Sequence, residues 1–366
     1  APWIYSGAVE HHGDLIDAIS RVRPLAGCDR QAVRVVRDPR WLGQTCRDSG
    51  LAYPATSATP DGIPLDGSFL VKPRAGAGGR GIAPWTVQEA ARDRSPGEWL
   101  WQRRLQGISK SVVILAGPST PIIVGTSEQF VGLEASRGPA FGWCGGVELR
   151  DLANDVFMRF AQHLVASGCR GLLGVDYLED ANGTCHVVEV NPRPTASMEL
   201  FERSWGISLV AAHLHACGFS TPRSSTSWHL PPSPVEGPFW AKGVLFARDE
   251  LVIAAADIDA VDRLDRSWRA TSFGWPSLAD VPHAGARIPA RSPILTVFAA
   301  GDDPPSCRAE VERRLQQVER MLMAERPPAE SKAHSQDASA GNQDGFTVAD
   351  HLHTSSQRRE NASVEP

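Results

Sequence analysis

The feature that most constrains this chain is a pair of short apolar runs joined by a turn. Residues 174–178 form the first run and residues 185–190 form the second. Between them lies Asn182-Gly183, a dipeptide that favours the positive φ angles of a tight hairpin turn. The pattern therefore predicts a β-hairpin whose two strands carry mostly apolar side chains.

Three oxygen-bearing side chains interrupt these predicted strands. Glu189 and Asn191 are two residues apart, so they point to one face, and folding back across the turn brings Asp176 onto that face. Two buried carboxylates on one face repel each other unless a cation lies between them. Oxygen donors without His or Cys favour a hard cation such as Mg²⁺. The alternative is an exposed hairpin with scattered acids, although the valines around Glu189 favour burial.

Arg193 follows the second strand and is flanked by Pro192 and Pro194. Two prolines fix the backbone and end the strand, so they hold the guanidinium in a stiff turn beside the predicted metal. A guanidinium in such a position can stabilise oxyanion charge that develops in a reaction. An ordinary surface arginine in a proline-rich turn explains these residues equally well.

The segment 74–81 contains four glycines and follows a predicted strand, 69–72, that ends in Lys72. Glycines let the backbone wrap closely around a ligand with its N–H groups pointing inward, which suits an anion. Lys72 and the flanking Arg74 and Arg80 add fixed positive charge, so phosphate is the predicted ligand. The loop lacks the Gly-Lys-Ser/Thr ending of a Walker motif, and a flexible surface loop is the alternative.

Composition indicates the class of protein. The chain has 366 residues, more than one typical domain, with 42% hydrophobic and 22% charged residues, as in an ordinary soluble globular protein. The net charge of −5 gives no indication of a nucleic-acid or membrane partner, and no apolar run is long enough to predict a membrane span. The seven cysteines form no C-x-x-C pair, so we expect reduced thiols in a cytoplasmic protein.

Apolar periodicity predicts the other helices and strands. The expected helices are 13–21, 37–48, 152–167, 198–217 and 307–324. The expected strands outside the hairpin are 2–7, 69–72, 98–105, 109–116 and 121–127, the last three forming an antiparallel meander.

Beyond residue 220 the composition changes three times. Residues 221–238 are rich in Ser and Pro and indicate a linker. Residues 239–324 are expected to form a small β-rich region that ends in a helix. Residues 325–366 are polar with very few apolar side chains, so we expect a disordered tail.

Three features occur together in one order: Lys72 with its glycine-rich loop, an extended stretch at 102–107, and Asp176 followed by Glu189-x-Asn191. This arrangement resembles the ATP-grasp superfamily. Its most specific part is the spacing of thirteen residues from Asp176 to Glu189, followed after Asn191 by an arginine. Within the superfamily, the sequence NPRPTAS is most similar to a group found beside genes of methanopterin- or methanofuran-type one-carbon pathways.

The resemblance implies an α+β fold in which two α+β lobes enclose a nucleotide. Residues 35–220 would form the ATP-grasp domain. Family members have a Rossmann-like domain in front, and residues 1–34 would be a truncated βα remnant of it. The β-rich region at 239–324 would follow after the linker.

The resemblance also implies how ATP would bind. The lysine would contact the adenine edge and the α-phosphate, and the glycines would cover the triphosphate. The backbone at the hinge between the lobes would meet the adenine edge. The implied nucleotide-binding residues are Lys72, Gly76, Gly78, Gly79, Gln102, Arg104 and Leu105.

In the same way, Asp176, Glu189 and Asn191 would hold one or two Mg²⁺ ions, with Mn²⁺ as an alternative. Arg193 would face the substrate as the catalytic residue. Family members activate a carboxylate as an acyl phosphate and then join it to an amine or a thiol.

Two positions depart from the family pattern. Family members often have a lysine after the Asp that starts the first helix, whereas Pro39 follows Asp38 here, so Arg37 or Arg40 would supply the phosphate contact. Family members also have a hinge Glu that reads the adenine amino group, and this chain has Arg103 at that position.

We therefore expect an ATP- and Mg²⁺-dependent carboxylate–amine ligase that releases ADP. Its partners would be a small carboxylate and a small amine, with a homodimer left open. One alternative is a biotin-carboxylase-like enzyme that phosphorylates bicarbonate, since residues 280–285 (DVPHAG) resemble the C-terminal part of such proteins. The other is a nucleotide-binding regulatory protein without turnover.

Overall fold

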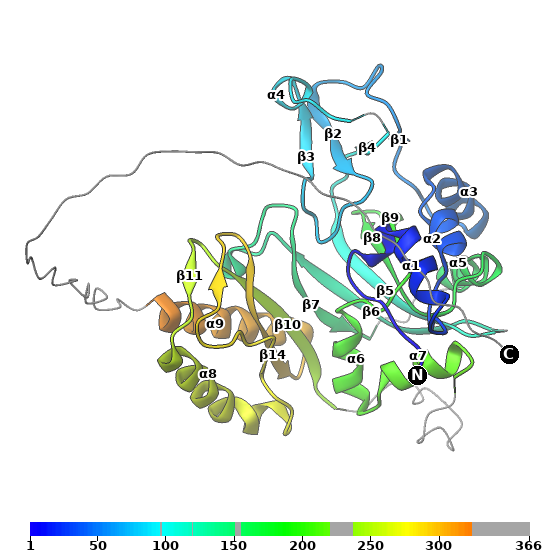
Figure 1. The fold of residues 1–366 in the computed structure, drawn as a ribbon. Coiled ribbons are helices and arrows are strands. Elements are labelled where there is room, and N and C mark those ends of the chain that lie inside the picture. Colours follow the sequence, from blue (N-terminus) through cyan, green and yellow to red (C-terminus); the bar gives the residue numbers. More distant parts are fainter. Residues whose placement is uncertain (96, 119, 151–154, 220–236, 324–366) are drawn as a thin grey trace, which may run out of the picture. The chain divides into compact units, whose positions relative to one another are not determined.

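Two β-sheets of unequal size organise the chain, as the computed structural model in Figure 1 shows. The structure describes residues 1–95, 97–118, 120–150, 155–219 and 237–323, which belong to one compact unit. Almost all of the predicted linker at 221–238 and the whole predicted tail at 325–366 lie outside these residues.

The smaller sheet is antiparallel. Its strands are β1 (Thr56–Ser57), β2 (Asp66–Pro73), β3 (Ala83–Thr86) and β4 (Trp99–Arg103), in the order β1-β4-β2-β3, and a short helix α4 (Val87–Ala90) follows β3. One face is aromatic, because Trp85 and Trp101 meet edge to face with ring centroids 5.5 Å apart and pack with Phe69. Side chains alternate along a strand, so Lys72 and Gln102 lie on the opposite face.

The larger sheet carries the predicted hairpin. In chain order its strands are β5 (Ile108–Ala116), β6 (Ile122–Val131), β7 (Trp143–Leu149), β8 (Gly171–Glu179), β9 (Cys185–Asn191), β10 (Phe239–Phe246), β12 (Leu278–Ala279) and β14 (Pro293–Gly301). They are arranged as β12-β14-β10-β7-β6-β5-β8-β9, and all neighbours are antiparallel. The hairpin is confirmed as β8–β9, at one edge of this sheet.

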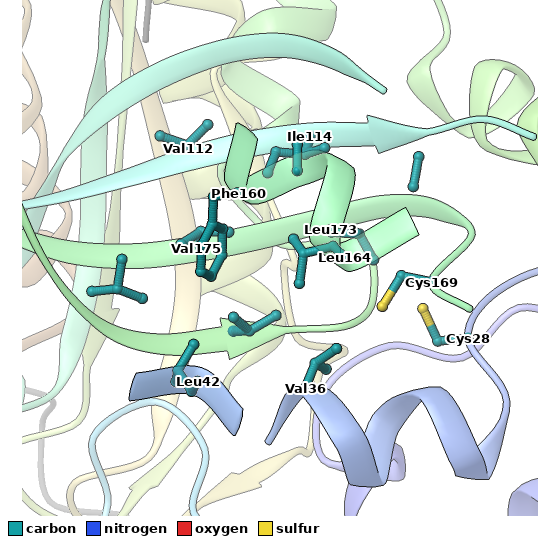
Figure 2. Packing of buried hydrophobic residues seen from close by; sticks show 14 of the residues in the cluster. Cys28, Val36, Leu42, Val112, Ile114, Phe160, Leu164, Cys169, Leu173 and Val175 are labelled. Carbon is teal, nitrogen blue, oxygen red and sulfur yellow. The ribbon is translucent and has the colours of Figure 1, made fainter. Parts of the chain in front are cut away.

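A helix covers one face of the larger sheet near the hairpin. This helix is α5 (Asp155–Ala166), and the apolar face predicted for it is confirmed. Figure 2 shows Phe160 and Leu164 of α5 lying against Ile114 of β5 and Val175 of β8. The hairpin is therefore fixed by burial of its apolar side chains, which leaves alternate positions of β8 and β9 free for polar side chains.

Three N-terminal helices pack on the same core beside β9. They are α1 (Gly13–Ser20), α2 (Arg30–Val36) and α3 (Pro39–Ser49). Val36 and Leu42 join the core shown in Figure 2. Asp29 and Asp38 cap α2 and α3 by accepting backbone N–H groups, and Gly50 ends α3 with a φ of 83°. These local signals position the three helices next to the strand that carries Glu189.

The opposite face of the larger sheet is covered by α6 (Met198–Trp205) and α7 (Leu209–Ala216). Phe201 of α6 packs with Val113 of β5 in a second apolar cluster. One continuous helix at 198–217 was the expectation, and it is wrong because Gly206 ends α6 with a φ of 65°.

The C-terminal region is not a separate sheet. Its strands β10, β12 and β14 extend the larger sheet beside β7. The strands β11 (Leu251–Val252) and β13 (Arg287–Ile288) pair with each other as a separate two-stranded ribbon. The region also contains α8 (Ala255–Trp268), which the β-rich expectation missed, and the predicted final helix α9 (Pro304–Met323).

Three further expectations are corrected. Residues 2–7 form no strand, because only Trp3 finds a partner, in a single bridge to Leu25. The helix α2 was not predicted. The segment 98–105 was placed in a meander with β5 and β6, yet β4 pairs with β2 in the smaller sheet, while β5, β6 and β7 form the meander.

All seven cysteines are free, as expected. None of the helices in the described part of the chain combines the length and the apolar character that a membrane span requires.

Candidate active site

A cavity of about 320 Å³ lies between the N-terminal helices and the strands β2 and β9. Its charged lining is mainly basic, which favours an anionic ligand. The basic side chains are Arg30, Arg34, Arg37, Lys72 and Arg74, and the acidic ones are Glu10 and Glu189.

Lys72 joins the two sheets at this cavity. Its Nζ donates to Gln102 Oε1 at 2.8 Å and to the carbonyl oxygen of Val188 at 3.3 Å. Val188 is the extra residue of a bulge in β9, since Asp176 pairs with Glu189 and Tyr177 with Val187. A bulge disrupts the ladder locally, and here it places a carbonyl where Lys72 contacts it.

Two opposing effects act on the pKa of Lys72. Burial lowers the pKa of Lys72, and the carboxylates of Glu189 and Asp176 oppose that effect. A lysine in this position can bind an anion that enters the cavity, at the cost of its bond to Gln102 or Val188.

The three predicted metal ligands lie on one face of the hairpin. Asp176 and Glu189 are directly opposite each other across β8 and β9, and Asn191 lies two residues beyond Glu189. Asp176 Oδ2 accepts from Asn191 Nδ2 at 2.8 Å, and Asp176 Oδ1 accepts from Gln129 Nε2 at 2.9 Å. Val175 and Tyr177 belong to the core under α5, so Asp176 points to the other face.

The electrostatics of this face fit a cation. Burial, and then repulsion by the carboxylate of Glu189, raise the pKa of Asp176 to about 6. A divalent ion between the two carboxylates would remove that repulsion. Among the residues that the structure describes, no group of three His, Cys, Asp or Glu side chains could hold a metal. A site here therefore needs the amide of Asn191 and ligands from a substrate, the arrangement typical of Mg²⁺.

Arg193 lies beside this set and is not a free surface residue. Its Nε donates to Glu10 Oε1 at 2.6 Å, and its Nη2 donates to Asn191 Oδ1 at 3.2 Å. Glu10 comes from η1 (Val9–His11), a short turn near the N-terminus. The N-terminal segment thus fixes the side chain for which a catalytic role is predicted.

The glycine-rich loop connects β2 and β3, and two contacts position it. The carbonyl oxygen of Gly76 accepts from His11 Nε2 at 3.0 Å. Gly79 has a φ of 76°, and a side-chain carbon there would collide with the carbonyl oxygen of Phe141. Only glycine fits at this close approach.

The predicted hinge residues are placed differently from one another. Gln102 is buried and faces Lys72, whereas the backbone N–H of Arg104 is already bonded to the carbonyl oxygen of Ser68 at 2.9 Å. Within the described residues the N–H of Leu105 has no such bond and is free to meet a ligand. Arg103 lies over the ring of Phe69 on the other face, so it does not face the cavity as a hinge Glu would.

Of the two arginines suggested for the missing lysine, only Arg37 lines the cavity. It donates to the carbonyl oxygen of Arg74, and its buried Nη1 has no hydrogen-bond partner among the residues that the structure describes. Asp38 caps α3 instead, which explains why Pro39 can follow it at the first helical position.

Sequence reasoning missed Glu10, His11 and Gln129. Glu10 and His11 lie in a turn with no periodic pattern, and Gln129 is one polar residue near the end of β6. Only the pairing of β6 with β5, and of β5 with β8, brings Gln129 to Asp176, and no local signal in the sequence shows this pairing.

Comparisons with known proteins agree with the fold described above. Residues 22–197 match the family described as an ATP-grasp domain. This match and the fold confirm the expected resemblance to the ATP-grasp superfamily and the expected α+β ATP-grasp fold. No curated protein matches the chain at a significant level.

Solved structures share the fold at low identity. Pyruvate carboxylase from Rhizobium etli aligns with a TM-score of 0.61 and 14% identity over 85% of this chain, which spans 29% of that protein. L-amino acid ligase from Bacillus licheniformis aligns with a TM-score of 0.60 and 14% identity over 82% of this chain and 75% of the ligase.

A third relative contains ligands. The biotin carboxylase domain of 2-oxoglutarate carboxylase from Hydrogenobacter thermophilus was solved with MgADP, ADP and bicarbonate. It aligns with a TM-score of 0.55 and 13% identity over 81% of this chain and 68% of that domain.

Proposed function

We propose that this chain is an ATP- and Mg²⁺-dependent, ADP-forming ligase. It activates a carboxylate as an acyl phosphate and joins it to an amine, or to a thiol. The observation that supports this most is the convergence of a basic cavity at Lys72 with the oxygen donors Asp176, Glu189 and Asn191. Among proteins of the same fold, one is named an L-amino acid ligase, and a biotin carboxylase domain was solved with MgADP and bicarbonate.

In this proposal the basic side chains bind the nucleotide. Lys72 binds the adenine edge and the α-phosphate, and Gln102 holds its ammonium group in place. Arg37 and Arg74 contact phosphates through Nη1 and Nε respectively, the nitrogen atoms that find no partner in the described part of the chain. Gly76, Gly78 and Gly79 let the loop backbone cover the triphosphate.

The oxygen donors bind the metal. Asp176, Glu189 and Asn191 hold Mg²⁺, with Gln129 fixing the carboxylate of Asp176. Bound Mg²⁺ supplies positive charge against the phosphate oxygens, which lowers the barrier to phosphoryl transfer.

Arg193 acts in the second step. The uncharged amine nitrogen forms a bond to the carbonyl carbon of the acyl phosphate, the bond from that carbon to the phosphate oxygen breaks, and the proton lost from nitrogen leaves with the departing phosphate. Negative charge develops on the former carbonyl oxygen, and the Arg193 guanidinium stabilises it. Glu10 and Asn191 hold the guanidinium before the substrate arrives, so little reorganisation is needed.

The test is a screen of ADP release against panels of carboxylates and amines. The proposal predicts ADP release that requires Mg²⁺, an acid and an amine together, and that falls on changing Arg193 to Ala. Release that depends on bicarbonate alone would favour the carboxylase alternative. Nucleotide binding without release under any combination would favour a regulatory protein.

A further inference from the structure

Glu10 has one engaged oxygen and one free oxygen. Its side chain is 1% exposed and lines the cavity. Oε1 accepts from Arg193 Nε at 2.6 Å, whereas Oε2 is buried and has no hydrogen-bond partner among the described residues. A buried carboxylate oxygen without a donor is costly and rare in folded proteins, so it calls for a ligand.

The polar groups near Glu10 donate elsewhere. The hydroxyl of Tyr5 donates to the carbonyl oxygen of Cys28 at 2.7 Å, and His11 Nε2 donates to the carbonyl oxygen of Gly76 at 3.0 Å. Both side chains interact electrostatically with Glu10 without bonding to Oε2. The missing donor therefore has to come from the cavity.

We propose that Glu10 Oε2 binds the ammonium group of the amine substrate. This inference rests on the proposed ligase function. An ammonium group offers three donors and a positive charge, which matches a single free carboxylate oxygen. The basic lining of the cavity binds the anionic partner, so the amine and the acyl phosphate would be held next to each other. The bound ammonium group gives one proton to Glu10 Oε2 before its nitrogen attacks.

Contact with Arg193 places this binding site at the reacting group. An amine bound to Oε2 lies beside the side chain that stabilises the oxyanion, because Oε1 of the same carboxylate holds Arg193. Glu10 is thus a binding residue through one oxygen and a positioning residue through the other.

The variant Glu10→Gln separates the two roles. Its amide oxygen can still accept from Arg193, while the amide NH₂ replaces Oε2 and presents donors to the incoming ammonium group. Binding of the amine is then lost without loss of the arginine contact. Glu250→Gln is the matched control, because Glu250 forms an exposed pair with Arg287.

The first experiment measures binding to protein saturated with Mg²⁺ and a non-hydrolysable ATP analogue. The probes are methylamine, ethanolamine and glycine, with ethylene glycol as an uncharged mimic of ethanolamine. We expect saturable binding of at least one ammonium probe, no binding of ethylene glycol, and at least tenfold weaker binding in Glu10→Gln only. Absence of ammonium binding, equal binding of the glycol, or unchanged binding by Glu10→Gln overturns the inference.

A second experiment distinguishes this inference from the ligase function. Hydroxylamine, mostly uncharged at pH 7, traps an acyl phosphate as a hydroxamate without needing an ammonium site. We expect wild type and the control Glu250→Gln to form hydroxamate, while KM for the amine rises at least tenfold in Glu10→Gln only. Wild type without hydroxamate contradicts the ligase function, whereas hydroxamate with an unchanged amine KM contradicts only the role of Glu10. If Glu10→Gln does not fold, the comparison of ammonium and glycol probes on wild type decides.

Discussion

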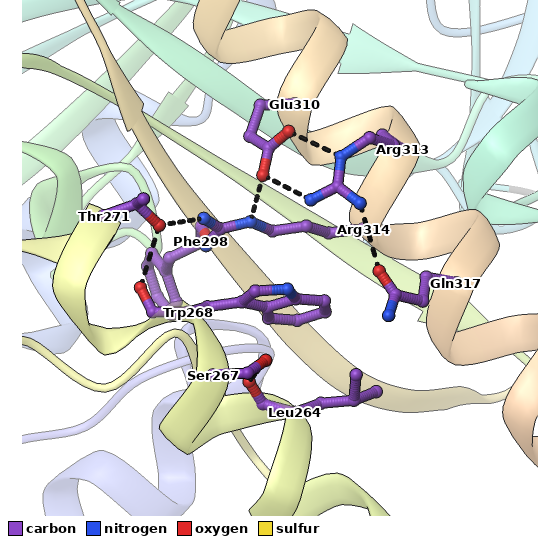
Figure 3. Close-up of polar contacts among 9 residues, drawn as sticks. All are labelled: Leu264, Ser267, Trp268, Thr271, Phe298, Glu310, Arg313, Arg314 and Gln317. Atoms are coloured by element: carbon purple, nitrogen blue, oxygen red, sulfur yellow. Dashed lines mark hydrogen bonds and ion pairs between the residues drawn. The ribbon is translucent and has the colours of Figure 1, made fainter.

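Two regions of the molecule bury charged side chains, and they differ in whether the polar atoms of these side chains have hydrogen-bond partners. In the C-terminal region Arg314 is 1% exposed, yet its nitrogens donate to Glu310, to the carbonyl oxygen of Phe298 and to Thr271, as Figure 3 shows. Its guanidinium also lies 4.8 Å from the ring centroid of Trp268. Each nitrogen that could donate has a partner, so this cluster is complete.

The cavity region differs because some of its buried polar atoms have no hydrogen-bond partner among the described residues. Within the part of the chain that the structure describes, Glu10 Oε2, Arg37 Nη1 and Arg74 Nε are buried without hydrogen-bond partners. Asp176 faces Glu189 directly, and that repulsion contributes to its raised pKa. Buried charge that is paired within the chain stabilises the fold, whereas buried charge left unpaired indicates a ligand.

The largest effect is expected on stability at the complete cluster. Changing Arg314 to Ala removes a fully buried side chain and the donor to the carbonyl oxygen of Phe298, although Arg313 still pairs with Glu310. From the cavity and the unsatisfied carbonyl together we expect the free energy of unfolding to fall by about 3–5 kcal/mol. Lys72→Met is the matched comparison, and it should lower stability much less, because burial already disfavours the charge of Lys72. Denaturant titration measures both. Equal losses in the two variants would break the distinction between the regions.

A comparable effect is expected on turnover at Arg193. Changing Arg193 to Ala should lower kcat by about 10²–10³ while ATP affinity stays close to normal, because the guanidinium stabilises charge only during the reaction. Arg193→Lys keeps a cation beside Glu10 but lacks the planar fork, so it should restore stability more than turnover. ADP release and calorimetry measure the two quantities. Near-normal turnover of Arg193→Ala would make Arg193 a turn residue only.

A smaller effect is expected from pH at Asp176, whose pKa is raised to about 6. Mg²⁺ binds the ionised carboxylate, so its affinity should fall about tenfold between pH 7 and pH 5 as Asp176 takes up a proton. Without metal, the free energy of unfolding depends on pH in the opposite direction and falls as pH rises. Between about pH 4 and 6 the folded protein keeps a proton on Asp176 that the unfolded chain has released. The stability that this bound proton contributes is lost as pH rises through 6. Mg²⁺ titration at several pH values tests this, and a flat profile would contradict it.

The smallest effect is expected from a pair of glycine variants in one loop. Gly78 and Gly79 both have positive φ, so alanine strains the backbone at either position. Only at Gly79 would the new carbon collide with Phe141, while Gly78 has open space around it. We expect ATP affinity to fall several-fold more in Gly79→Ala than in Gly78→Ala, while the strained φ lowers the free energy of unfolding of both by about 1 kcal/mol or more. Identical affinities would show that the approach to Phe141 does not position the loop.

The comparison also explains what sequence alone could predict. The hairpin, Lys72 before its glycines and the helix α5 are encoded by local periodicity and turn residues. The sequence predicts that Asp176 and Glu189 share a face, but their direct opposition depends on the bulge at Val188, which shifts the register set at the turn by one residue.

The missed features depend on distant contacts. Arg193 and Glu10 are 183 residues apart in sequence, and nothing local predicts their contact. Likewise β4 pairs with β2 and not with β5, although all three have strand-like sequences. The helix α8 lies between short β segments, which masked its helical spacing of Ile258, Val261 and Leu264. Pairing partners of this kind are decided by tertiary packing, not by local propensity.

The most direct test of the central claim is calorimetric titration of a non-hydrolysable ATP analogue with and without Mg²⁺. The protein should bind it at one site in a Mg²⁺-dependent manner, and Glu189→Gln should weaken binding at least tenfold because it removes a metal ligand. The control Glu250→Gln should leave binding unchanged. Absence of nucleotide binding with Mg²⁺, or normal Mg²⁺-dependent binding by Glu189→Gln, would contradict the assignment of the cavity and the hairpin to Mg²⁺ and ATP.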